Sequence, residues 1–280
     1  MKYIKLVIGV SEEYQEGVIA ELFDMDFDGF EQREGQIITY ITKENFGISD
    51  RERIDQLLAA YPGNGFIESE EVVADQNWNE QWEQTIQAQQ IGRFFVKPTW
   101  SRESVPKDKI LLEIDPKMSF GTGYHETTRL VLKMLADTAQ EGDLVIDAGT
   151  GTGILSIAAV KLGASEVFAF DIDEWSISNT QENILLNDVA DTITVKQGSA
   201  DVIPEEYKAD LLLANIERNT ILQLLPNLEA ALKNDGILIL SGLLETDEAL
   251  IREELKSSFR VEEMRQENEW IALQARKQSL

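Results

Sequence analysis

Val145–Leu155, VIDAGTGTGIL, is the segment that decides the fold. It begins in an apolar run that indicates the end of a buried parallel strand, which closes at Asp147. Glycines then occupy every second position, 149, 151 and 153, before an apolar helical run over 154–162. Glycine is needed where the backbone turns with a positive φ or lies flat against a ligand. A strand, a glycine turn and a helix N-terminus together predict the nucleotide-binding corner of a doubly wound α/β sheet.

The spacing of the glycines narrows the choice of ligand. In a dinucleotide-binding turn, G-x-G-x-x-G, the third glycine would stand where this sequence has Ile154. A P-loop is excluded because no Gly-Lys-Ser/Thr follows. An acid followed by three alternating glycines, as in Asp147–Gly153, is instead typical of methyltransferases that use S-adenosylmethionine (AdoMet). The alternative interpretation is a purely structural glycine turn.

A second acid supports a nucleoside site. Residues 166–170 predict the next strand, which ends at Asp171, 171 − 149 = 22 residues after Gly149. An acid at the tip of the second strand can accept hydrogen bonds from the ribose hydroxyls. Either Asp171 or Asp173 could instead be the N-cap of the helix predicted over 174–186. Asp173 is better placed for that cap, which leaves Asp171 free for the ribose.

The composition excludes several classes of protein. A chain of 280 residues predicts two domains, one smaller than the other. There is no cysteine and only one histidine, His125, so neither a disulfide nor a thiolate or multi-histidine metal site is expected. No apolar run approaches the ~20 residues of a membrane span, and the N-terminus lacks the apolar core of a signal peptide. We therefore expect a cytoplasmic protein without a metal.

The net charge also bears on possible partners. The chain has 25 Lys and Arg against 51 Asp and Glu, a net charge of −26. A direct nucleic-acid partner is not expected, because binding phosphates requires a basic surface. The acidic surface serves either general solubility or the steering of a basic protein substrate.

Residues 1–74 predict a small α+β domain. Apolar periodicity indicates strands and helices in the order β-α-β-β-α followed by a further strand, and the arrangement resembles ferredoxin-like modules. No catalytic constellation is present, so we expect a binding or structural role. The expected elements are a strand over 2–10, a helix over 12–25, a strand region over 30–41 with a hairpin across Glu34-Gly35, a helix over 49–61 capped by Ser49 and ended by Pro62-Gly63, and a strand over 65–73.

Residues 75–105 predict a linker. Trp78 and Trp82 lie four apart and so share one face of a helix expected over 77–90. They serve either to pack this helix against a domain or to contact a substrate. A single strand over 91–100, ending at Pro98, and a polar loop complete the linker.

Residues 106–280 predict the domain that carries the glycine turn. A strand over 109–114 precedes the segment DPKMSFGTGYHETT, whose Phe120-Gly121-Thr122-Gly123 turn leads into a helix that begins at 125–128. Strands over 192–196 and 209–214 follow, and Asn215 stands at the carboxyl end of the second, next to the strand that ends at Asp147, where open α/β sheets bind ligands. A helix over 219–232, a strand over 236–240, a helix over 246–257 and two closing strands, over 259–266 and 269–275, complete a seven-stranded sheet.

These motifs together resemble one family. DPKMSFGTGYHETT, VIDAGTGTGIL, AFDID and LLLANI, in this order and spacing, are similar to the ribosomal protein L11 methyltransferases, the PrmA family. The preceding NWNEQWEQ resembles the linker of that family. The resemblance is close over residues 75–275, whereas residues 1–70 resemble the substrate-recognition domain of the family only in outline.

The resemblance implies a class I methyltransferase sheet, AdoMet as the cofactor and ribosomal protein L11 as the protein substrate. By position, it implies that Thr128, Gly149, Gly151, Asp171 and Asn215 contact AdoMet. Phe120 and Thr127 would line the side of the pocket from which the methyl group is transferred. The turn reads AGTGTG where many members have FGCGSG, and Glu217 follows ANI where an apolar residue is common, which leaves the substrate side of the pocket open.

Members of the family methylate lysine side-chain amines and an N-terminal α-amine. A lysine, whose pKa is ~10.4, must lose a proton before it attacks the methyl group. Asn215 is the candidate to hold the amine, and His125 is either a base or a structural residue that orients the FGTG loop. Two other functions stay open: a methyltransferase for another protein or a small molecule, and an AdoMet-binding interaction module without activity. Nothing in the sequence demands an oligomer, so we expect a monomer.

Overall fold

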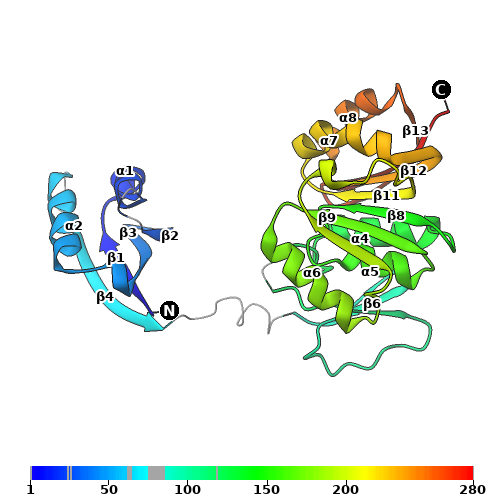
Figure 1. The fold of residues 1–280 in the computed structure, drawn as a ribbon. Helices are drawn as coiled ribbons and strands as arrows, with labels where there is room; N and C mark the ends of the chain where they lie inside the picture. Colours follow the sequence, from blue (N-terminus) through cyan, green and yellow to red (C-terminus); the bar gives the residue numbers. More distant parts are fainter. Residues whose placement is uncertain are drawn as a thin grey trace. The chain divides into compact units, whose positions relative to one another are not determined.

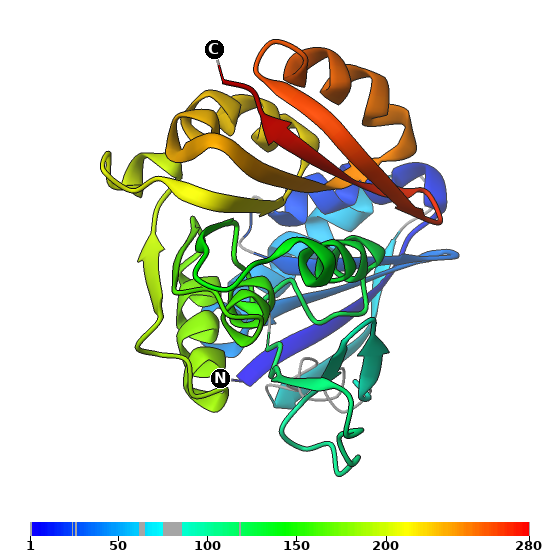
Figure 2. The same ribbon diagram turned by 90° about the vertical axis from the view of Figure 1, so that its right-hand side faces the viewer.

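The structure, a computed structural model, describes residues 2–23, 25, 27–61, 65–74, 86–117 and 119–279. The chain forms two compact units, Met1–Trp78 and Asn79–Leu280. Figure 1 labels helices and strands of both units, and Figure 2 gives a second view.

The first unit is a four-stranded antiparallel sheet with two helices. Its strands lie in the order β2-β3-β1-β4, and β2 and β3 form a hairpin in which Arg33 pairs with Gln36, as predicted for Glu34-Gly35. The resemblance to ferredoxin-like modules stays a prediction. The elements, in chain order, are β1 (Lys2–Gly9), α1 (Glu12–Phe23), β2 (Asp28–Arg33), β3 (Gln36–Thr42), α2 (Ile48–Ala60) and β4 (Phe66–Ala74), with a 3-10 turn over Lys43–Asn45.

Alternation along β1 builds the core of the first unit. Ile4, Leu6 and Ile8 are buried, and they belong to one apolar cluster with residues of both helices, such as Val18 and Leu58. Burying apolar surface in this way is the main force that holds a small domain together.

The cap of α2 differs from the sequence prediction. The helix is capped by Gly47 and not by Ser49, because the carboxylate of Asp50 accepts the Gly47 backbone N–H at 2.8 Å. Ser49 consequently lies within the first turn. The predicted stop at Pro62-Gly63 lies outside the described residues.

The segment that follows the first unit also differs from the prediction. The predicted Trp78 and Trp82 helix face lies outside the described residues, but Gln89 and Gln90 belong to a strand and not to a helix. The single strand predicted over 91–100 is wrong as well. The chain turns at Gly92, whose φ of 55° suits glycine, so that β5 (Gln89–Ile91) and β6 (Phe94–Lys97) form a hairpin. β6 then pairs in parallel with β7 (Ile110–Glu113).

The second unit is organised around a seven-stranded sheet in the order β10-β9-β8-β11-β12-β14-β13, which confirms the predicted α/β fold. The first five strands are parallel, and β14 and β13 add an antiparallel hairpin. The elements are α4 (Glu126–Thr138), β8 (Leu144–Ala148), α5 (Ile154–Lys161), β9 (Glu166–Asp171), α6 (Glu174–Leu186), β10 (Ile193–Gln197), β11 (Ala209–Asn215), α7 (Arg218–Ala231), β12 (Leu232–Leu244), α8 (Glu248–Leu255), β13 (Phe259–Glu267) and β14 (Trp270–Lys277), with 3-10 turns over Ala200–Val202 and Glu245–Asp247.

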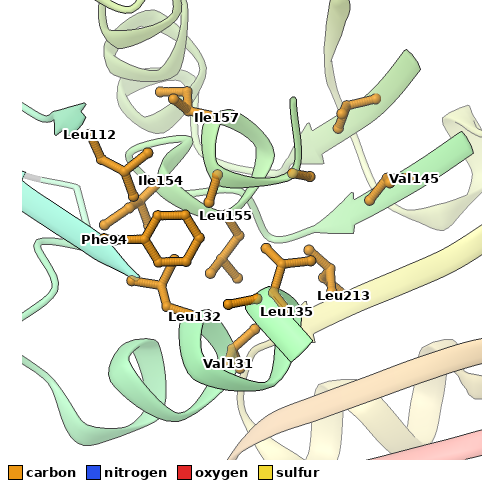
Figure 3. Packing of buried hydrophobic residues seen from close by; sticks show 14 of the residues in the cluster. Phe94, Leu112, Val131, Leu132, Leu135, Val145, Ile154, Leu155, Ile157 and Leu213 are labelled. Carbon is orange, nitrogen blue, oxygen red and sulfur yellow. The ribbon is translucent and has the colours of Figure 1, made fainter. Parts of the chain in front are cut away.

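Helices cover both faces of this sheet, because its central parallel strands are apolar on both sides. Val145 and Leu213 face the apolar cluster built with α4 and α5, where Phe94 of β6 also packs (Figure 3). Ile146 and Leu212 face the opposite cluster, built with α7 and α8.

The strand order fixes the position of the functional site. From β8 the chain continues to β9 and β10 on one side and then returns to β11 on the other side of β8. A crevice forms at the carboxyl ends of strands where the order reverses in this way, and open α/β sheets bind their ligands there.

Candidate functional site

A cavity of about 510 Å³ opens at the carboxyl ends of β8, β9, β11 and β12, a size typical of small-molecule sites. It brings together most of the residues that the sequence singled out. Those that line it are Phe120, His125, Thr127, Gly149, Gly151, Asp171 and Asn215.

The glycine turn forms one wall of the cavity with its backbone. Gly149 and Gly151 have φ values of 74° and 56°, a conformation that favours glycine. A Cβ on Gly151 would lie 2.3 Å from the carbonyl oxygen of Phe120, and a Cβ on Gly149 would lie 2.3 Å from Cγ2 of Ile216. Only glycine at these two positions allows the neighbouring segments to approach so closely.

Asp171 lies at the tip of β9, as predicted, but it is not free of contacts. One carboxylate oxygen accepts the backbone N–H of Gly151 at 3.0 Å, and the other accepts that of Asp173 at 3.1 Å. A carboxylate has about four lone-pair sites, so acceptor capacity for a ligand hydroxyl remains. Asp173 caps α6 through the Ser176 backbone N–H at 2.9 Å, which confirms the predicted cap; this hydrogen bond is the main reason why the pKa of Asp173 is lowered.

Asp147 stands behind the turn and does not line the cavity. Its fully buried carboxylate accepts hydrogen bonds from the Thr150 hydroxyl at 2.9 Å and from the Ser156 hydroxyl at 2.6 Å. Its Oδ1 has no partner among the described residues. Burial therefore raises the pKa of Asp147 to about 6, against the lowering effect of the hydrogen bonds from Ser156 and Thr150.

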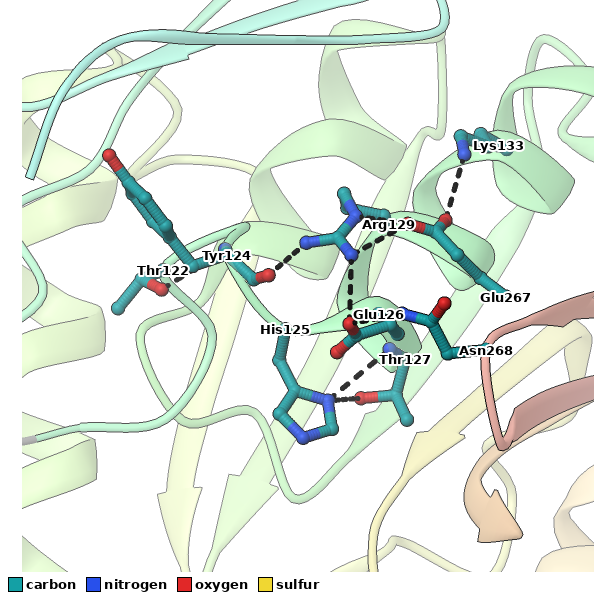
Figure 4. A network of polar contacts seen from close by, with 9 residues as sticks. All are labelled: Thr122, Tyr124, His125, Glu126, Thr127, Arg129, Lys133, Glu267 and Asn268. Carbon is teal, nitrogen blue, oxygen red and sulfur yellow. Dashed lines mark hydrogen bonds and ion pairs between the residues drawn. The ribbon is translucent and has the colours of Figure 1, made fainter.

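His125 is the N-cap of α4 (Figure 4). Its Nδ1 accepts the backbone N–H of Thr127 at 3.3 Å and lies 2.9 Å from the Thr127 hydroxyl. Because a backbone N–H can only donate, Nδ1 must carry the lone pair, and Nε2 carries the proton of the neutral ring. The lone pair that a base would need is therefore used by the cap.

Aromatic rings line the side of the cavity near this cap. The ring centroid of His125 lies 5.3 Å from that of Phe120 and 4.8 Å from that of Trp270, the latter in an edge-to-face arrangement. Phe120 is 52% exposed. We call Phe120, His125 and Trp270 the aromatic wall.

Asn215 ends β11 next to β8, as predicted. Its side-chain N–H donates to the Thr128 hydroxyl at 3.4 Å, whereas its Oδ1 is buried and has no partner among the described residues. Thr128 is fully buried and does not line the cavity, so it contacts the site through Asn215. An unpaired buried acceptor is costly unless a ligand supplies the donor.

Several lining residues escaped the sequence analysis, Trp270 and Gly242 among them. Trp270 comes from the β13–β14 hairpin, and no local pattern links it to the glycine turn. Gly242 follows the apolar run of β12, and a Cβ there would lie 2.2 Å from the carbonyl oxygen of Ile216. A glycine shortly after the apolar run of a parallel strand is the same signal as in β8, and it could have identified Gly242, which lies near the end of β12.

Among the described residues, no group of three or more His, Asp and Glu side chains is arranged to hold a metal ion. In the same part of the chain, no helix is long and apolar enough to span a membrane.

Comparison with known proteins identifies the family of the chain. The family model described as "Ribosomal protein L11 methyltransferase (PrmA)" matches residues 6–278. A ribosomal protein L11 methyltransferase of Porphyromonas gingivalis is 40% identical over 263 residues, which cover 91% of this chain and 88% of the relative. One of Caldanaerobacter subterraneus is 32% identical over 314 residues and covers 99% of both chains.

A solved structure is similar as well. The ribosomal protein L11 methylase of Lactobacillus delbrueckii is 33% identical, with a TM-score of 0.64, and the match covers 69% of this chain and all of that one. The sequence match over nearly the whole chain and the similar fold lead to one conclusion: the chain belongs to the ribosomal protein L11 methyltransferase (PrmA) family.

Proposed function

We propose that the cavity holds AdoMet with its methyl group directed toward Asn215, where an amine of the substrate is bound. Membership of the family makes the protein an AdoMet-dependent methyltransferase whose substrate is ribosomal protein L11. The observation that carries the proposed geometry concerns Asn215, which lines the cavity. Its Oδ1 is buried and has no hydrogen-bond partner among the described residues.

The residues around the glycine turn fit AdoMet. Gly149 and Gly151 present backbone to the cavity, and the absence of a Cβ lets Ile216 and Phe120 approach the turn closely, which shapes the wall for a ligand with no phosphate. The remaining lone pairs of Asp171 are suited to ribose hydroxyls. Thr127 and Thr128 would support the other side, Thr128 through Asn215. When bound, AdoMet supplies a methyl group on a positively charged sulfur.

The task of the protein is then to present a neutral amine. Oδ1 of Asn215 accepts an N–H of that amine, which leaves the nitrogen lone pair free to attack. The aromatic wall excludes water from the reacting atoms and contacts the aliphatic part of a lysine side chain. The proton of the lysine, whose ordinary pKa is ~10.4, leaves to solvent before the attack.

His125 orients the site and does not act as the base in this proposal. Its Nδ1 is used to cap α4, and a second proton on the ring, which would go to that nitrogen, would break the cap. The ring contributes by packing between Phe120 and Trp270.

We further propose which groups of the substrate are modified, where the protein acts and in which oligomeric state. The modified groups are lysine side-chain amines and the N-terminal α-amine of L11, and the protein acts as a cytoplasmic monomer on the protein and not on nucleic acid. The net charge of −26 supports a basic protein partner and disfavours a phosphate backbone. Residues 1–74 recognise the substrate, 75–105 form the linker, and 106–280 carry the methyltransferase site.

A test of the reaction is the transfer of labelled methyl from AdoMet to purified L11, with mass spectrometry to locate the label. We expect label on lysines and on the N-terminal amine. Asn215→Ala should lower kcat by about a hundred-fold, since one interaction with the reacting group is lost, while AdoMet remains bound. Asn219→Ala, four residues further along and outside the lining of the cavity, is the matched control and should behave as the unchanged protein. No transfer to L11, or a normal kcat in Asn215→Ala, would contradict the proposal.

Removal of residues 1–74 tests whether the first unit recognises the substrate while the second unit binds AdoMet. The second unit has its own core, so the shortened protein should bind AdoMet in calorimetry and lose methylation of L11. Unchanged methylation of L11 would exclude a recognition role for the first unit.

A further inference from the structure

Arg129, on the first turns of α4, contacts the preceding loop, the β13–β14 hairpin and its own helix with one side chain (Figure 4). Its guanidinium donates to the carbonyl oxygen of Tyr124, and it lies 3.3 Å from a carboxylate oxygen of Glu126. Its Nε donates to Glu267, at the end of β13, at 2.7 Å. None of these residues lines the cavity.

We propose that Arg129 is a positioning residue for methyl transfer, which sets the aromatic wall by holding the loop Phe120–His125 and the β13–β14 hairpin at a fixed separation. The inference rests on the proposed function of the cavity. Arg129 does not line the cavity, so its effect passes through the segments that it joins.

A second set of contacts holds the β13–β14 hairpin to α4. Glu267 also accepts from Lys133 at 3.0 Å, and the side-chain N–H of its neighbour Asn268 donates to Glu126 at 2.9 Å. Asn268 has a φ of 54°, the left-handed conformation that a tight turn needs. Trp270 follows two residues later and reaches the cavity, so the position of Glu267 determines that of Trp270.

Arg129 also contacts the loop Phe120–His125 directly. The carbonyl that Arg129 binds belongs to Tyr124, the residue before His125. The ring of His125 packs between Phe120 and Trp270, at centroid distances of 5.3 and 4.8 Å. Arg129 thus acts on both ends of the aromatic wall, on His125 through the Tyr124 backbone and on Trp270 through Glu267.

An arginine is required for this task. Its planar guanidinium presents five N–H donors in fixed directions and can serve three acceptors at once, whereas a lysine ammonium is a compact charge on a flexible stem. Arg129 is 20% exposed and Glu267 28%, so water competes only in part for these contacts. Although partial burial acts to raise it, hydrogen bonds from Arg129 and Lys133 hold the pKa of Glu267 below its usual value, and the carboxylate stays ionised.

The cofactor side of the cavity has anchors that do not involve Arg129, and Thr152 of the glycine turn itself holds the start of the loop by donating to the carbonyl oxygens of Phe120 at 2.9 Å and Gly121 at 2.7 Å. Gly149 and Gly151 follow β8, and the Gly151 N–H is held by Asp171 at the end of β9. Loss of the Arg129 contacts should therefore change the acceptor side of the reaction and leave AdoMet binding intact.

The experiment compares Arg129→Gln and Arg129→Lys with the unchanged protein. We expect the AdoMet Kd from calorimetry to stay within about two-fold, while kcat/KM for L11 falls by about ten- to a hundred-fold, the effect of a reacting group misplaced by about 1 Å. Lysine should not rescue the activity. Amide hydrogen exchange over residues 120–125 and 267–270 should become faster in both variants, a readout that does not depend on turnover.

Asp137→Asn is the matched control. It removes the 2.8 Å ion pair between Arg265 and Asp137, which also joins β13 to α4 but lies two turns further along the helix. Its kcat/KM should be unchanged. Equal losses of activity in Asp137→Asn and Arg129→Gln, or unchanged hydrogen exchange in Arg129→Gln, would overturn the positioning role. If the unchanged protein transfers no methyl to L11, the proposed function fails, whereas the exchange experiment still decides the role of Arg129.

Discussion

The carboxylate of Asp171 accepts the backbone N–H of Gly151 at 3.0 Å, which ties the tip of β9 to the middle of the glycine turn. The acid proposed to bind the ribose is thus also the residue that shapes the wall beside it. Substitution at this position should affect the ligand in two ways at once.

Asp171→Ala should weaken AdoMet binding by at least about ten-fold, because it removes the acceptor for the ribose and releases the turn, and one hydrogen bond to a charged group contributes about 1.5–3 kcal/mol. Calorimetry measures the change. Asp173→Ala is the control: it removes the cap of α6 and should cost about 1 kcal/mol of stability without changing the AdoMet Kd. Equal effects of the two variants on Kd would show that Asp171 acts only through the fold.

Gly151→Ala should abolish AdoMet binding. The added Cβ would lie 2.3 Å from the carbonyl oxygen of Phe120, so either the turn or the loop must move. Gly142→Ala separates this clash from backbone strain, because Gly142 has a φ of 90° but no atom within 4 Å of its Cβ position. That variant should lose about 1–3 kcal/mol of stability, measured by denaturant unfolding, and keep its affinity. Normal affinity in Gly151→Ala would contradict the assigned role of the turn.

His125→Asn should keep the cap of α4, since asparagine is a good N-cap residue, and lose only the ring. We expect reduced turnover, but a plot of log kcat/KM against pH that rises with the same slope as in the unchanged protein, because the lysine of the substrate sets the proton dependence. A break in the neutral range that disappears in His125→Asn would instead identify His125 as the base.

Asp147 should make stability depend on pH. Its pKa is about 6 in the folded protein against 3.8 for an unperturbed aspartate, so the folded state binds more protons between these values. The free energy of unfolding should therefore fall as pH rises from about 4 to about 6 and then level off. The side chain introduced in Asp147→Asn cannot titrate. The difference in the free energy of unfolding between this variant and the unchanged protein should therefore stop changing with pH above about pH 6. A constant difference from about pH 4 to about pH 7 would contradict the raised pKa.

Much of the second unit could be predicted because its signals are local. The glycine turn, the acid after β9 and the cap at Asp173 each depend on a few neighbouring residues, and the bounds of α6 agree with the prediction. The strand predicted over 91–100 was wrong because Gly92 turns the chain and the partner strand β7 lies more than ten residues away. β12 is longer than the predicted 236–240, since its ends are set by pairing with β11 and β14.

The functional site was predicted only in part, because some of its residues meet through contacts between distant parts of the sequence. Residues at the ends of β8, β9 and β11 could be brought together by the rule for parallel strands. Trp270 could not, because its approach to His125 depends on the antiparallel hairpin and on the contacts of Arg129 and Glu267, which are 138 positions apart in the sequence.

The most direct test of the proposed AdoMet site is a crystal structure of the protein with S-adenosylhomocysteine, the product that AdoMet leaves after methyl transfer. We expect the ribose hydroxyls within hydrogen-bond distance of Asp171, the methionine part along Gly149 and Gly151, and the sulfur facing Asn215. A ligand bound elsewhere, or one whose sulfur points away from Asn215 and the aromatic wall, would contradict it.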